Sequence, residues 1–111
     1  MNATWLRRAP TLVGVVHLAP LPGAPRFGGS MSQILDRAAT DAKALEKSGF
    51  DAVIVENFGD SPFYPAEVPA ETTAALSIAC QRVRESVAIP VGVNCLRNDG
   101  VASIAIAAAA Q

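Results

Sequence analysis

The stretch TLVGVVH (residues 11–17) is the first of three short apolar segments, and AVIVE (52–56) and PVGVN (90–94) follow it along the chain. Each segment is rich in Val or Ile and is flanked by turn-forming residues, which is the pattern of a β-strand. The apolar residues are nearly continuous rather than alternating, which favours parallel strands covered on both faces. The sequence therefore predicts three buried parallel strands.

Helical patterns occupy the gaps between these segments. The first helix is predicted from Ser30, where SMSQ (30–33) fits a capping box, to Gly49, which is a typical C-terminal cap. The second is predicted to start near Pro69, and a third at Asn98 or Asp99. Apolar stripes at helical spacing are Ile34, Leu35, Ala38, Ala42 and Leu45 in the first helix, and Leu76, Ala79, Cys80, Val83 and Val87 in the second.

The spacing of these elements predicts the fold class. Strands recur roughly every 40 residues with a helix in each gap, which predicts parallel strands. We expect an α/β fold, the N-terminal (βα)3 portion of a TIM-type (β/α)8 barrel, as a single partial domain over residues 1–111. The two long loops, residues 18–29 and 57–68, both follow strands, so a site is expected at the carboxyl ends of the strands.

The end of the chain departs from this regular pattern. Between residues 101 and 110 the only polar side chain is Ser103, so a helix buried nearly all round is expected there. The third strand would also stand at an open sheet edge. We therefore expect either a fragment of a longer protein or pairing with a partner, such as a homo-oligomer that covers the edge.

Composition excludes several functional classes. Nine basic and ten acidic residues give a net charge of −1, which does not favour nucleic acid as a partner. One histidine and two cysteines are too few for a structural metal site, and reduced cytosolic thiols are expected. The pair Arg7-Arg8 resembles a twin-arginine export signal, but the apolar run after it is too short. No run is long enough to span a membrane, so a cytoplasmic location is expected.

Polar side chains end each predicted strand. In a barrel, His17, Glu56 and Asn94 would converge on one mouth, where His17 and Glu56 are candidates for acid/base catalysis. Structural alternatives stay open. His17 can bond loop backbone, Glu56 can pair with Arg97 or Arg26, and Asn94 can cap the third helix or bond a neighbouring loop.

Other candidate residues have simple structural interpretations. The run Arg97-Asn98-Asp99 is typical of a helix start. Cys80 lies on an apolar stripe, and Cys95 near the mouth is either a buried or a reactive thiol. The segment GGS (28–30) can hold an anion at a helix N-terminus but lacks the order of a nucleotide P-loop. The loop APLPGAP (19–25) is either a lid or a packed loop.

Three motifs resemble one family of proteins. VVHLAPLPGAP (15–25), VENFGDSPFY (55–64) and GVNCLRND (92–99) are similar to the BtpA family, which includes SgcQ-like proteins. The resemblance implies a ribulose-phosphate-binding type of β/α barrel. It also implies ligand-binding roles at motif positions, beside the acid/base candidates His17 and Glu56; these positions are Asn57, Asp60, Asn94, Arg97, Asn98 and Asp99.

The resemblance leads to two main hypotheses of function. The founding member is a peripheral thylakoid protein on the cytoplasmic side, needed to assemble or stabilise photosystem I, so the first is biogenesis of a membrane protein complex through peripheral contact. The second is a barrel enzyme that acts on a small phosphorylated sugar or nucleoside, and no cofactor or metal is expected. Phosphate sites in such barrels usually follow strands seven and eight, which lie beyond this chain. A third hypothesis is a truncated product without a function of its own.

Overall fold

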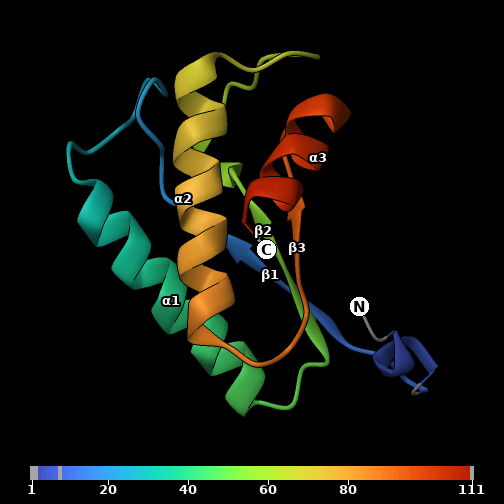
Figure 1. Cartoon of the computed structure of the whole chain (residues 1–111). Helices are drawn as coiled ribbons and strands as arrows, with labels where there is room; N and C mark the ends of the chain where they lie inside the picture. Colours follow the sequence, from blue (N-terminus) through green and yellow to red (C-terminus); the bar gives the residue numbers. More distant parts are fainter. Residues whose placement is uncertain (1–2, 8, 111) are drawn as a thin grey trace.

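The computed structural model describes residues 3–7 and 9–110 and shows a three-stranded sheet with helices between the strands (Figure 1). The strands are β1 (Val13–His17), β2 (Ala52–Glu56) and β3 (Val91–Asn94); the helices are α1 (Met31–Lys47), α2 (Ala70–Ser86) and α3 (Gly100–Ala109), with short 3-10 helices η1 (Thr4–Arg7) and η2 (Phe58–Asp60). The alternation confirms the predicted α/β class. Arg8 of the pair Arg7-Arg8 lies outside the described residues.

The sheet is parallel throughout. Its order is β1-β2-β3, so each strand pairs with the next one along the chain. The register places His17 opposite Glu56 and Glu56 opposite Asn94, so the last residues of the strands are neighbours. Sequential parallel strands with a helix after each are the arrangement of a partial TIM-type barrel, as predicted.

Caps that the sequence predicts fix the helix ends. The Ser30 hydroxyl accepts a hydrogen bond from the backbone N–H of Gln33 at 3.3 Å, at the start of α1. Gly49 follows α1 with φ of +93°, a conformation that a side chain would disfavour. Asp99 caps α3 by accepting from the backbone N–H of Ala102 at 2.9 Å. Ser30 and Asp99 thus mark the starts of α1 and α3, and Gly49 follows the end of α1, as the sequence predicts.

The core lies between the sheet and the helices, which cover one face of the sheet (Figure 1). Its fully buried side chains include Val16, Val53, Val55, Leu76, Val83 and Ile106. On the other face of the sheet, Val13 and Val15 are 41% and 42% exposed, and burial alternates along β1. The expected cover on both faces is therefore wrong for this chain, because all three helices pack on the same side.

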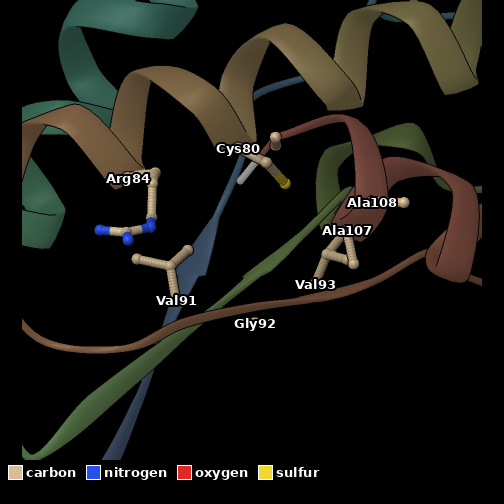
Figure 2. Close-up of a pocket in the computed structure, with 8 residues that line it drawn as sticks. Cys80, Arg84, Val91, Gly92, Val93, Ala107 and Ala108 are labelled. Atoms are coloured by element: carbon tan, nitrogen blue, oxygen red, sulfur yellow. The ribbon is translucent and has the colours of Figure 1, made fainter. Parts of the chain in front are cut away.

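The apolar helix α3 is also less buried than its sequence predicts. Ala102 and Ile106 face the core, but Val101 and Ile104 are 83% and 73% exposed. An open groove of about 590 Å³ lies where α2, β3 and the end of α3 meet, and Figure 2 shows Arg84 and Val91 beside it. The small side chains of α3 leave this space open at the free edge of β3.

Candidate functional site

The last residues of the three strands form a polar cluster on the open face of the sheet. The Nε2 atom of His17 lies 3.3 Å from Oε2 of Glu56, and the Asn94 side-chain amide donates to Oε1 of Glu56 at 2.9 Å. The strand register creates this cluster, because it sets the three residues side by side across the sheet. Each oxygen of the Glu56 carboxylate thus has its own neighbour.

The surroundings of His17 keep it accessible and oriented. Its ring stacks on Phe58, with centroids 4.4 Å apart and planes at 17°. The side chain of His17 is 51% exposed and that of Glu56 is 19% exposed, so solvent or a ligand can reach the imidazole. No arginine pairs with Glu56 among the described residues, so neither Arg97 nor Arg26 is its partner. A carboxylate and an imidazole in contact can exchange a proton, which is the chemistry of an acid/base pair.

Asn57 and Asp60 form a separate, buried network between loops. The Asn57 side chain donates to Leu96 O at 3.1 Å and accepts from Leu96 N at 2.7 Å. It also donates to Oδ2 of Asp60 at 3.2 Å, while Oδ1 of Asp60 accepts from Leu21 N at 2.8 Å. This network ties the loops that follow β1, β2 and β3 to one another. We name these four residues, Leu21, Asn57, Asp60 and Leu96, the loop network.

The run after β3 divides between a buried and an exposed part. Asp99 is buried and accepts from the backbone N–H groups of Ala102 and Val68, both at 2.9 Å. These two hydrogen bonds hold the pKa of the Asp99 carboxyl below its usual value. Arg97 and Asn98 are exposed, and Asn98 takes a left-handed backbone with φ of 66°. The structure therefore brings His17, Glu56 and Asn94 together and places Arg97, Asn98 and Asp99 outside that contact.

Comparison with known proteins agrees with this fold. The BtpA family matches residues 8–111, which is nearly the whole chain. The chain belongs to the BtpA family. Within it, the chain is 48% identical over 96 residues to an uncharacterized protein of Pyrococcus furiosus, covering 86% of this chain and 36% of that relative.

Two further relatives of this BtpA-family chain have names. It is 43% identical over 96 residues to the photosystem I biogenesis protein BtpA of Synechocystis, covering 86% of this chain and 33% of that protein. It is 36% identical over 112 residues to the sgc region protein SgcQ of Escherichia coli, covering 96% of this chain and 41% of that protein. The chain thus spans well under half the length of these relatives. No solved structure matches it.

Both cysteines of this BtpA-family chain are buried thiols. Burial, with a contribution from Cys95, raises the pKa of the Cys80 thiol to about 12. Burial raises the pKa of the Cys95 thiol to about 11, with contributions from the charges of Asp99 and Asp60. A protonated, enclosed thiol is a poor nucleophile. Of the two alternatives for Cys95, the structure favours the buried one.

The described residues offer neither a metal site nor a membrane span. In residues 3–7 and 9–110, no group of three or more His, Cys, Asp and Glu side chains is placed to hold a metal ion. No helix in those ranges has the length and apolar character needed to cross a membrane.

Sequence reasoning did not single out Phe58, which lies inside a quoted motif. It follows Glu56 by two residues, and its ring contacts both His17 and, at 6.2 Å and 54°, Phe63. An aromatic residue just after a strand-end carboxylate is the signal that was available. Its role as a stacking partner requires the bend of η2, which the apolar pattern does not show.

Proposed function

We propose that His17 and Glu56 are the acid/base pair of a barrel enzyme that acts on a small phosphorylated sugar or nucleoside. The observation that carries this proposal is the 3.3 Å contact between the two side chains at the carboxyl ends of neighbouring parallel strands. In β/α barrels this end of the sheet is where catalytic groups gather. Asn94 supports the same role, because its amide fixes Glu56 without neutralising it.

The geometry divides the work between the two side chains. Oε2 of Glu56 faces His17, so a proton lost by substrate to one group can be shared with the other. Phe58 holds the imidazole ring in place, as a positioning residue. Phosphate contacts would come from later strands of the complete barrel, since such sites usually follow strands seven and eight.

The test uses the complete protein and a panel of sugar phosphates and nucleosides. Glu56→Gln and His17→Ala should each abolish ligand turnover or binding while leaving the unfolding midpoint near that of the parent, because both side chains lie on the open face. Glu85→Gln is the matched control, since Glu85 is an exposed carboxylate on α2 whose side chain accepts from the Gln81 amide. Normal binding by both site variants would mean that the cluster is structural.

A second candidate function is biogenesis of a membrane protein complex, such as photosystem I, through peripheral contact at the cytoplasmic face. It is favoured by the 43% identity to a relative whose name states that role. The exposed apolar side chains of α3, Val101 and Ile104, are available for such a contact. Deletion of the full-length gene separates the two functions. Normal membrane complexes together with accumulation of a phosphorylated metabolite would eliminate the biogenesis role.

We propose pairing between copies of the chain as the alternative to later strands for covering the edge of β3. β3 is an edge strand, and the groove beside it is lined by apolar side chains that include Val91 and Val93. A second copy would cover this edge and remove it from solvent. If light scattering gives the molar mass of a monomer at every protein concentration, the oligomer is rejected.

A further inference from the structure

A second cavity lies among the loops, apart from the acid/base cluster. It has a volume of about 330 Å³, which is within the range of small-molecule sites. Its walls come mainly from the loops after β1 and β2 and are largely apolar and stiff; they include Pro25, Pro62, Phe63, Tyr64 and Pro65. Neither His17 nor Glu56 lines it. The cavity is therefore a different place from the proposed catalytic site.

The polar groups of this cavity are mainly acceptors. Asp60 lines it with a buried carboxylate, whose oxygens accept from Leu21 N and from Asn57 and can each accept again. Both side-chain N–H groups of Asn57 are already used within the loop network. Among residues 3–7 and 9–110, no lysine, arginine or histidine lines the cavity. A ligand must therefore bring donors to it.

Thr72 adds an unpaired hydroxyl at the first turn of α2. The residue is 5% exposed and lines the cavity, and none of the hydrogen bonds among the described residues involves its hydroxyl. Among those residues, Trp5 Nε1 is the side-chain polar atom that is fully enclosed and has no hydrogen-bond partner. The Thr72 oxygen also has no partner among them but is not fully enclosed, so it must reach open space. The cavity is the space that Thr72 borders. A buried hydroxyl without a protein partner is costly unless a ligand or water bonds it.

Two buried carboxylates lie at the cavity: Asp60 lines it, and Asp99 accepts from the backbone N–H of Val68, which lines it. The buried carboxylates of Asp60 and Asp99 each receive hydrogen bonds but pair with no basic side chain among the described residues. Burial is the main cause of the raised pKa of the Cys95 thiol, and the charges of Asp99 and Asp60 add to it. Buried charges are ordinarily paired. These two carboxylates disfavour an anion and favour a cation in the cavity.

We propose that the cavity binds a small organic cation, a primary amine on an apolar body. The ammonium would donate to the Asp60 carboxylate and the Thr72 hydroxyl, and the body would lie against Phe63 and Tyr64. Aromatic faces attract cations, and proline walls give a rigid apolar surround. This inference stands apart from the proposed acid/base function, because it uses neither His17 nor Glu56.

The experiment compares three probes of one shape on the whole chain, followed by amide chemical shifts of the loops. Benzylamine should bind at least tenfold more tightly than benzyl alcohol, and benzoate should not bind. Thr72→Val, which keeps the shape of the side chain, should weaken benzylamine several-fold, whereas the neighbouring Thr73→Val should leave it unchanged. Tyr64→Ala should weaken benzylamine binding as well, because it removes an aromatic face from the cavity. Tyr64 is 52% exposed, so its loss does not open the core.

Several outcomes overturn the proposal. Equal binding of benzylamine and benzyl alcohol would remove the role of charge, and binding of benzoate would reverse its sign. Unchanged binding by Thr72→Val and Tyr64→Ala would place the probe elsewhere. Absence of benzylamine binding by the parent chain at millimolar concentration would reject the site. Glu56→Gln should bind benzylamine normally, so failure here and failure of the acid/base proposal are separate results.

Discussion

Replacement of Asn57 by alanine tests whether this residue holds the loops together rather than binding a ligand. The side chain is 1% exposed and takes part in three hydrogen bonds, two with the Leu96 backbone and one with Asp60. At about 1 kcal/mol for each hydrogen bond, the loss amounts to about 3 kcal/mol. A domain of this size has about 5–15 kcal/mol of stability in all. Asn57→Ala should therefore remove a large part of it.

The assay is urea unfolding followed by far-ultraviolet circular dichroism, together with a thermal melt. A loss of about 3 kcal/mol should lower the melting temperature by about 12 °C, at about 4 °C for each kcal/mol. Asn94→Ala is the matched control, since Asn94 is exposed and, among the described residues, its side chain bonds Glu56 alone. We expect that control to cost under about 1 kcal/mol. Equal losses for the two variants, or a loss under about 1 kcal/mol for Asn57→Ala, would refute the loop network as a main source of stability.

Two other predictions concern a close backbone contact and the buried thiols. Gly59→Ala should destabilise the fold by over about 1 kcal/mol, because its Cβ would lie 2.6 Å from the backbone oxygen of Leu18. The control Gly28→Ala should be neutral in the same melts, because its Cβ would meet none of the described residues within 4 Å. Stability should fall as pH rises from about 9 towards 11, because the fold keeps the thiols of Cys80 and Cys95 protonated and the unfolded chain does not. The double variant Cys80→Ala/Cys95→Ala should lose less stability between those pH values. An equal loss in the parent and the double variant would contradict the thiols as the cause.

The elements of the fold follow from local patterns in the sequence. Apolar segments place the strands, and Ser30 and Asp99 cap helices as their residue types predict. The covered face of the sheet does not follow from these patterns. Val15 and Val16 are both apolar, yet Val15 is 42% exposed and Val16 is 1% exposed. Only the packing of all the helices on one side separates them, and periodicity within one strand cannot show that.

The candidate site was predictable in part, from strand ends alone. The meeting of His17 with Glu56 follows once the strands are parallel and in sequence order, because their last residues then share one edge. The loop network did not follow, since it depends on where Leu21 and Leu96 bring their backbone groups. Loop backbone positions of this kind have no signature in residue type.

Glu56 and Asn57 show why neighbouring polar residues at a strand end need not act together. Successive side chains of a strand point to opposite faces, so the two leave β2 in different directions. Glu56 turns to the open face, where His17 and Asn94 meet it, and Asn57 is buried among the loops. Under the acid/base proposal, changes on the open face should therefore alter ligand turnover with little effect on the free energy of unfolding, and changes among the loops should do the reverse. This separation allows each role to be tested without disturbing the other.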